Sequence, residues 1–280
     1  MKHNILIFGA SYGSLLATKL LLGGHSVKLA CTPAEVELFN KEGSRVRMPV
    51  KGREGLVEID SRKLPGKLSA DVPTAIKLSG YDLVVLGMQE PQYRSPGVRE
   101  LLDAVAKAKL PCMSIMNMPP LPYLARIPGI DVKTIESCYT DASVWKSFDP
   151  NFMTLCSPDP QAFRPPEEKL NVLQVSLPTN FKVARFPSDA HTAMLRDLQS
   201  DIEAVRQRVG VETGNALQIR QRRHVHDRHA RFSGFCHRVQ QFAHTGGAVL
   251  RLLHRQRDHV VIGRVDAGWP SGGQLARQLA

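Results

Sequence analysis

A short segment near the N-terminus combines residues that could hold an anion. It runs from residue 9 to residue 14, and only Ala10 and Tyr12 in it are neither glycine nor serine. Small residues let a phosphate approach the backbone closely, and the first amides of a helix are free to bind it. A diphosphate is therefore the ligand we expect here, with five residues of the segment in contact with it: Gly9, Ser11, Tyr12, Gly13 and Ser14.

The elements around this segment predict a βαβ unit. Residues 4–8 form an apolar run typical of a buried strand, residues 15–22 have a helical apolar face, and residues 25–31 form a second strand. Such a unit, with a glycine turn after its first strand, is the core of the Rossmann dinucleotide-binding fold. Its G-x-G-x-x-G fingerprint would place glycines at 9, 11 and 14, so Ser11 and Ser14 depart from it. An ordinary strand–helix turn is the alternative interpretation.

The end of the second strand carries information about the cofactor. An Asp or Glu at this point would hold the ribose hydroxyls of NAD, but residues 30–33 contain no carboxylate. The sequence therefore favours NADP(H) over NAD(H). Thr32 could donate a hydrogen bond to the 2′-phosphate, or it could simply cap the helix predicted over residues 33–41.

Two later strands are expected to complete the cofactor site. Residues 81–88 are the clearest buried strand in the chain, and residues 111–117 form the next, with an amphipathic helix over 97–109 between them. Ligands bind outside the carboxyl ends of parallel strands. We therefore expect four residues at these ends to contact the cofactor: Gly87, Met88, Gln89 and Asn117.

The remaining segments define the predicted organisation. Residues 44–50 and 55–59 indicate a hairpin, residues 71–77 a helix, and residues 132–137, 152–155, 172–175 and 181–186 further strands. We predict an α/β fold, with a Rossmann-type, mostly parallel sheet and flanking helices. Residues 1–187 would form the dinucleotide-binding domain with a sheet extension. Residues 188–280 would begin as a helix over 188–209 and continue as an irregular, poorly ordered basic region.

The motifs of the first half resemble those of one enzyme family. The glycine turn, the Gly24-His25-Ser26-Val27 approach to the second strand, the strand after Asp82 and the strand ending at Asn117 resemble the ketopantoate reductase family over residues 4–135. Opine dehydrogenases share much of this pattern. The resemblance implies hydride transfer from NADP(H) to a small 2-oxo acid or imine. It also implies that Gly9, Ser11 and Ser14 hold the pyrophosphate and that Asn117 lies near the nicotinamide.

The chain departs from this family at the positions that matter for catalysis. Family members usually carry lysine where this chain has Gln89, and Asn-Gly where it has Asn117 and Met118. They use a lysine of the second domain as general acid, but no lysine follows Lys182. Lys146 lies too early and precedes a turn, so we expect it to be a surface lysine. The catalytic residues are therefore unassigned, and we expect the chain to lack full reductase activity.

Basic residues are distributed unevenly along the chain, whose net charge is +11. The first 182 residues hold 14 lysines and 8 arginines, whereas the last 98 hold 15 arginines and no lysine. Three interpretations stay open for the last part: a solvated basic tail, a nucleic-acid-binding arm on a non-catalytic nucleotide-binding module, or a reading frame that changes near residues 205–215. The arm is the least favoured, because few aromatic residues accompany the arginines.

Cysteine content and hydropathy exclude several classes of protein. The five cysteines include no C-x-x-C pair, which argues against a disulfide framework and a zinc site. No apolar stretch reaches 18 residues and no export signal is evident, so we predict a cytoplasmic protein without a membrane span. We expect a small-molecule substrate as its partner and no bound metal, because the histidines at 224, 226 and 229 are scattered among arginines.

Overall fold

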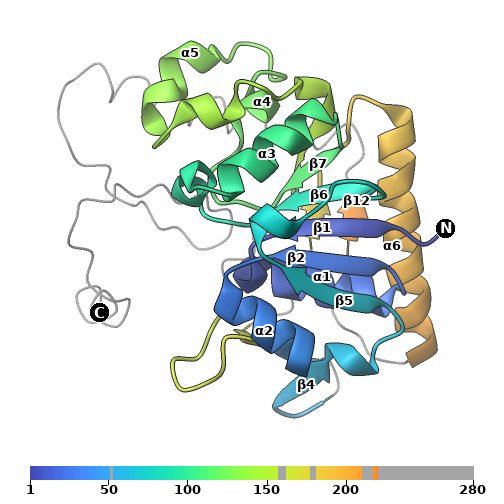
Figure 1. Cartoon of the computed structure of the whole chain (residues 1–280). Coiled ribbons are helices and arrows are strands. Elements are labelled where there is room, and N and C mark those ends of the chain that lie inside the picture. The colour runs from blue at the N-terminus through green and yellow to red at the C-terminus, as the bar shows by residue number, and fades with distance from the viewer. Residues whose placement is uncertain (51–52, 157–161, 177–180, 210–216, 220–280) are drawn as a thin grey trace, which may run out of the picture.

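The computed structural model describes residues 1–50, 53–156, 162–176, 181–209 and 217–219. Its centre is a six-stranded sheet in which every neighbouring pair of strands is parallel. Figure 1 shows five of these strands stacked in the order β7, β6, β1, β2, β5. The full order is β5 (Lys67–Asp71), β2 (Ser26–Ala30), β1 (Asn4–Phe8), β6 (Leu83–Leu86), β7 (Cys112–Ser114) and β8 (Met153–Leu155).

This strand order places β1 at the point where the connections reverse direction. The chain first moves from β1 to β2 and β5, and then returns to the other side of β1 through β6, β7 and β8. If only the six strands of this sheet are numbered in chain order, their order across the sheet is 3-2-1-4-5-6. This is the strand order of dinucleotide-binding domains. A crevice for ligands is expected at the carboxyl ends of β1 and β6, where the two directions diverge.

Each face of the sheet is covered by its own apolar core. Ile5 and Ile7 of β1 point into one core, together with residues of α1 (Ala10–Leu22), α2 (Pro33–Glu42) and α6 (Asp189–Val209). Leu6 and Phe8 point into the other, which includes α3 (Val98–Lys107), α4 (Leu121–Leu124) and α5 (Val132–Ile135). Because both faces are covered, β1 is apolar from Ile5 to Phe8 and β6 from Leu83 to Leu86, as expected for parallel sheets.

Two smaller sheets extend the fold. The first has the order β4 (Leu56–Asp60), β3 (Arg45–Pro49), β10 (Val172–Val175), β9 (Ala162–Phe163). The second pairs β11 (Phe181–Val183) in parallel with β12 (Leu217–Ile219), and α6 connects these strands. Short 3-10 helices complete the chain: η1 (Ser61–Lys63), η2 (Pro73–Ala75), η3 (Glu90–Arg94), η4 (Glu136–Cys138), η5 (Ala142–Trp145) and η6 (Pro150–Phe152).

The middle of α6 meets the amino ends of β1 and β2 at a pair of histidines. His25 is completely buried, and its Nδ1 accepts a hydrogen bond of 3.2 Å from the backbone N–H of His3. The two rings are stacked with 5.7 Å between their centroids. On α6, Asp197 Oδ2 lies 4.0 Å from His3 Nε2 and Asp201 Oδ2 lies 3.5 Å from His25 Nε2. The helix α6 therefore packs on this end of the sheet through two contacts between a carboxylate and an imidazole.

The structure confirms the predicted fold class and corrects three local predictions. Residues 71–77 are not a helix: they hold the end of β5 and the short η2. Residues 132–137 are not a strand, because they form α5 and the start of η4. The expected six-residue turn after β1 is reduced to Gly9, since α1 already begins at Ala10.

The predicted tail can be followed only in part. Of residues 210–280, the structure describes residues 217–219, so the interpretations offered for that region lie outside the described residues. The domain boundary at residue 187 stays a prediction. Within the described part of the chain, no helix combines the length and apolar composition that a membrane span requires.

Candidate functional site

The connection between β1 and α1 is a single glycine in a conformation that favours glycine. Gly9 has φ of +93°, and a Cβ atom there would lie 3.0 Å from Met88 Cγ and 3.1 Å from the Gly87 carbonyl oxygen. A side chain is therefore excluded by the backbone angle and by the neighbouring strand end. The absence of a side chain lets the start of α1 approach the carboxyl end of β6.

The first turn of α1 presents donors that the helix itself does not use. The initial N–H groups of a helix have no partner one turn earlier, and the helix dipole adds partial positive charge at this end. Gly9 does not contribute its own amide, because that N–H donates to the Ala30 carbonyl at 2.9 Å. Ser11 and Tyr12 are half-buried, so this turn remains open to a ligand. An anion is the ligand that such a group of donors can bind.

Gly13 and Ser14 lie inside the fold. A Cβ atom on Gly13 would come within 2.6 Å of Ile7 Cγ2, so this glycine allows α1 to pack directly on β1. Ser14 is buried and its hydroxyl donates to the Ala10 carbonyl within the same helix. That hydroxyl is therefore engaged by the backbone. Ser11 and Tyr12 are therefore the residues of this turn that stay open to a ligand, and Gly13 has a packing role.

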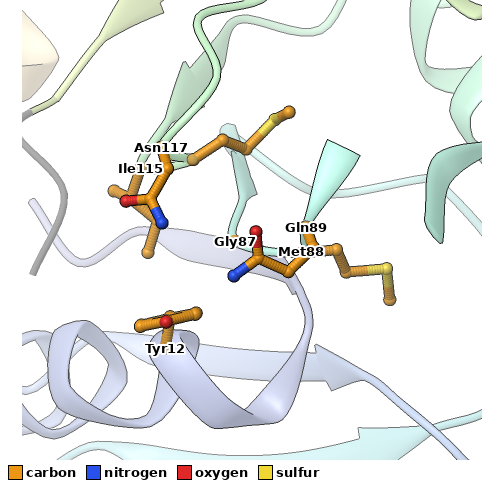
Figure 2. A pocket seen from close by; sticks show the side chains of 7 residues that line it. Tyr12, Gly87, Met88, Gln89, Ile115 and Asn117 are labelled. Atoms are coloured by element: carbon orange, nitrogen blue, oxygen red, sulfur yellow. The ribbon is translucent and has the colours of Figure 1, made fainter. Parts of the chain in front are cut away.

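A pocket adjoins this turn at the point where the sheet order reverses (Figure 2). It is a shallow depression with about 190 Å³ of empty space, part of it open to solvent, far less than a whole dinucleotide occupies. Gln89 and Asn117 are exposed, and their amide groups face the Tyr12 ring across the gap in Figure 2. Three segments supply the lining, namely α1, the end of β6 and the end of β7: Tyr12, Gly87, Met88, Gln89, Ile115, Met116 and Asn117.

The pocket is polar without being charged. Among its lining residues the polar side chains are one phenol and two carboxamides, from Tyr12, Gln89 and Asn117. Tyr12 is the one lining side chain that could release a proton. Carboxamides can donate to one ligand atom and accept from another, which suits a ligand that itself carries an amide. The site is therefore suited to hold a neutral polar ring beside an anion-binding helix start.

A second cluster lies at the carboxyl end of β2, where α2 begins. Thr32 caps this helix: its N–H and its hydroxyl donate to Glu35 Oε2 at 2.9 Å and 2.8 Å. The other carboxylate oxygen, Oε1, lies 2.7 Å from Nη2 of Arg164. Burial alone would raise the pKa of Glu35, but its bonds to Thr32 and Arg164 outweigh burial and hold that pKa below its usual range. Glu35 is therefore an ionised, fully engaged carboxylate.

The structure brings most of the sequence-predicted residues together. Five of them line the pocket (Tyr12, Gly87, Met88, Gln89 and Asn117), Gly9 and Ser11 lie in the adjoining turn, and Thr32 lies at the end of β2. Ligand contact itself stays a prediction for all of these residues. Lys146 is exposed, as expected for a surface lysine, and is not among the lining residues.

Four residues of these two clusters were missed by the sequence analysis. Ile115 and Met116 lie within the predicted strand 111–117, and the last two residues before Asn117 could have been included. Glu35 carries the sequence signal of a capping box, Thr32 followed three residues later by a glutamate. Arg164 had no such signal, because its partner is 129 positions earlier in the chain.

Comparisons with known proteins agree with this architecture. No family model matches the sequence, and no curated protein is similar to it. A solved structure assigned to the ketopantoate reductases, from Ralstonia solanacearum MolK2, has a TM-score of 0.52 at 14% identity and covers 78% of this chain and 60% of its own. D-mandelate dehydrogenase in complex with NADH and anilino(oxo)acetate has a TM-score of 0.48 at 16% identity, with 78% and 57% covered.

A 2-dehydropantoate 2-reductase from Bacillus subtilis has a TM-score of 0.47 at 16% identity, with 77% and 57% covered. The chain therefore spans about 60% of the length of the solved structures it matches. At these identities the likeness concerns the fold. The resemblance to ketopantoate reductases that the motifs indicated is confirmed at that level.

Proposed function

We propose that this chain binds a nicotinamide dinucleotide along the carboxyl edge of its parallel sheet and belongs to the NAD(P)-dependent oxidoreductases that act on small 2-oxo acids. One observation carries the proposal. The polar pocket and the open first turn of α1 lie side by side at the reversal point of the sheet, between β1 and β6. That is where a diphosphate and the ring attached to it are bound in this class of sheet.

Each part of the site has a distinct task in this proposal. The amides around Ser11 and Tyr12 hold the diphosphate. The side chains of Gln89 and Asn117 orient the nicotinamide carboxamide in the pocket. The cofactor supplies a hydride, and the protein has to hold the carbonyl carbon next to it and deliver a proton to the carbonyl oxygen.

None of the residues discussed so far is assigned as the proton donor. The lysine that the family resemblance implies has no counterpart after Lys182. Tyr12 lines the pocket, yet it sits on the turn to which we assign the diphosphate. We therefore propose cofactor binding with little or no reductase activity, and we assign no catalytic residue.

We propose NADP(H) as the cofactor because no free carboxylate is found at the end of β2 among the described residues. The sequence argument depended on the missing carboxylate at residues 30–33. The structure adds Glu35 close to the end of β2, but its charge is balanced by Arg164. The end of β2 thus offers no free carboxylate for ribose hydroxyls, which supports the choice of NADP(H).

The substitution Ser11→Asp tests the anion site most directly. A carboxylate in the first turn favours the helix itself, so the fold should be preserved while the diphosphate is repelled. We expect NADPH affinity to fall by roughly tenfold or more, the equivalent of about 1.4 kcal/mol. Isothermal titration calorimetry with NADPH measures this change, and thermal shifts with NADPH against NADH report the cofactor preference.

Ser147→Asp is the matched control, because Ser147 is exposed and does not line the pocket. It introduces the same charge elsewhere and should leave the dissociation constant unchanged. A Ser11→Asp protein that binds NADPH as tightly as the parent chain would contradict the proposed placement of the diphosphate.

A further inference from the structure

The ion pair between Glu35 and Arg164 occupies the place where the adenosine end of a dinucleotide would lie. With the nicotinamide in the pocket and the diphosphate at the start of α1, the rest of the molecule extends over the end of β2. The strand ends at Ala30, and α2 starts two residues after Cys31. The ribose of the adenosine is therefore expected beside Thr32 and the first turn of α2. This inference rests on the proposed function.

Arg164 reaches this place from a distant part of the chain. It directly follows β9, and Figure 1 shows the yellow segment around it passing beside α2. The side chains of Arg164 and Glu35 are 23% and 11% exposed, so the contact is mostly shielded from water. Nη2, the nitrogen that faces Glu35, is itself buried. A guanidinium carries five N–H donors on three nitrogens, so Nε and Nη1 are the nitrogens with which Arg164 would meet a second ligand.

Glu35 cannot serve the ribose in the way that an NAD-selective carboxylate does. Its Oε2 accepts both bonds from Thr32, and its Oε1 faces Arg164. A carboxylate that holds two ribose hydroxyls has to accept two hydrogen bonds, whereas this one has filled Oε2 and keeps at most one lone pair of Oε1. The pair therefore offers a guanidinium rather than a carboxylate to whatever lies at the end of β2.

The charge balance around this position depends on Arg164. The end of β5 contributes Asp71, whose Oδ2 lies 3.3 Å from Nζ of Lys28, so that second carboxylate has its own cation. With Arg164 present, the two carboxylates and two cations cancel. Without Arg164, Glu35 would leave a net negative charge where the 2′ substituent lies. Such a charge disfavours a phosphate and is tolerated by a hydroxyl.

We infer that Arg164 determines the choice between NADP(H) and NAD(H), by donating to the 2′-phosphate of the adenosine ribose while it neutralises Glu35. A planar guanidinium with five donors can face a carboxylate on one edge and a phosphate on the other. The residue that selects the cofactor would then come from the β9–β10 segment of the small sheet, far from the βαβ unit that binds the rest of it.

The test uses two nucleotides that differ only in the 2′-phosphate. Binding of 2′,5′-ADP and of 5′-AMP to the full chain is measured by isothermal titration calorimetry, for the parent protein and for Arg164→Ala and Arg164→Lys. We expect the parent chain to prefer 2′,5′-ADP. Arg164→Ala should weaken 2′,5′-ADP by roughly 10- to 100-fold, the usual effect of losing a charge-assisted hydrogen bond, and should leave 5′-AMP unchanged. The affinity of Arg164→Lys for 2′,5′-ADP should lie between those of the parent chain and Arg164→Ala, because lysine keeps the charge but lacks the planar set of donors of a guanidinium.

Arg62→Ala is the matched control. Arg62 is paired with Asp60 and lies against Gly43 at the other end of α2, and a ten-residue helix is about 15 Å long. This variant removes an equal charge near the same helix and should change neither affinity. Glu35→Gln provides a second variant with the side-chain shape retained. It frees the guanidinium from its carboxylate, so 2′,5′-ADP should bind several-fold more tightly and 5′-AMP should be unaffected.

The outcomes separate this inference from the proposed function. Equal affinities of the parent chain for the two nucleotides would overturn the inference, and so would an Arg164→Ala protein that keeps the preference, while dinucleotide binding itself would stand. If the parent chain binds neither nucleotide nor NADPH, the proposed function fails and the inference fails with it. A matching loss in Arg62→Ala would show that general charge, and not Arg164, produces the preference.

Discussion

Gly13 has a packing role that the sequence analysis did not assign to it. Its contact with a diphosphate stays a prediction, whereas a Cβ atom at this position would lie 2.6 Å from Ile7 Cγ2. The close packing of α1 on β1 is itself a requirement of dinucleotide-binding folds. The shortened fingerprint therefore keeps the packing glycine one position earlier than the usual spacing.

We predict that Gly13→Ala destabilises the protein by about 1–3 kcal/mol, because overpacking of a buried contact outweighs the better helix propensity of alanine. Urea unfolding followed by circular dichroism measures this loss. In an Ile7→Ala background the clashing methyl is gone, so the same substitution should cost much less. If the two substitutions are additive, the contact is not the cause.

At this scale the sequence predicted residues that strand ends bring together and missed Arg164, which reaches its place through packing. Tyr12, Gly87, Met88, Gln89 and Asn117 end or begin elements, and the rule for parallel strands brings such ends together. Arg164 follows a two-residue strand of the small sheet and reaches α2 by packing. No periodicity or turn signal in the sequence encodes that approach.

Among the elements, the two wrong assignments have clear physical causes. Residues 71–77 begin at the last residue of the edge strand β5, and Pro73–Ala75 alone turn there, as the short 3-10 helix η2. Residues 132–137 contain the β-branched Val132, Thr134 and Ile135, which favour a strand. However, Asp131 caps the segment by accepting from the Lys133 amide, and its apolar residues Val132 and Ile135 are one helical turn apart. The central strands were predictable because both of their faces are buried.

The docking of α6 is expected to depend on pH through His25. Burial lowers the pKa of His25 to about 4 from its usual 6.5, although the nearby Asp201 opposes that shift; Lys2, His3 and the N-terminal amine lower the pKa further. The folded protein therefore keeps this ring neutral, whereas the unfolded chain takes up a proton below pH 6.5. The contribution to stability is complete above pH 6.5 and is lost as the pH falls toward 4.

We predict that the free energy of unfolding of the parent chain falls by up to about 3 kcal/mol relative to His25→Gln between pH 7 and pH 4, because each pKa unit corresponds to 1.36 kcal/mol. Urea titrations of both proteins at a series of pH values provide the measurement. The glutamine variant serves as the reference, since all other groups titrate in both proteins. Curves that run parallel over this range would refute the assignment.

For the molecule as a whole, the chain shares its fold with a solved structure assigned to the ketopantoate reductases and spans about 60% of the length of that structure. No lysine follows Lys182, so the general acid implied by the family resemblance is absent. A general acid contributes a factor of about 10² to 10⁴ to such a reaction.

We therefore predict that the chain, mixed with NADPH and ketopantoate, consumes NADPH no faster than the same mixture without ketopantoate. The absorbance of NADPH reports the reaction, and an authentic ketopantoate reductase run in parallel shows that the assay works. Turnover clearly above that background would mean that another group delivers the proton, and Tyr12, the ionisable side chain of the pocket, would be the first to substitute.

The central position of β1 has a consequence during synthesis on the ribosome. The ribosome makes β1 before β6, so one of the two hydrogen-bonding edges of β1 waits for Leu83, 75 positions after Phe8. At about 5–20 residues per second, the ribosome needs roughly 4–15 s to deliver that partner. During this interval the most apolar strand of the nascent chain has an open edge that another polypeptide could occupy. Early binding of a chaperone would protect β1, the strand around which the sheet later forms.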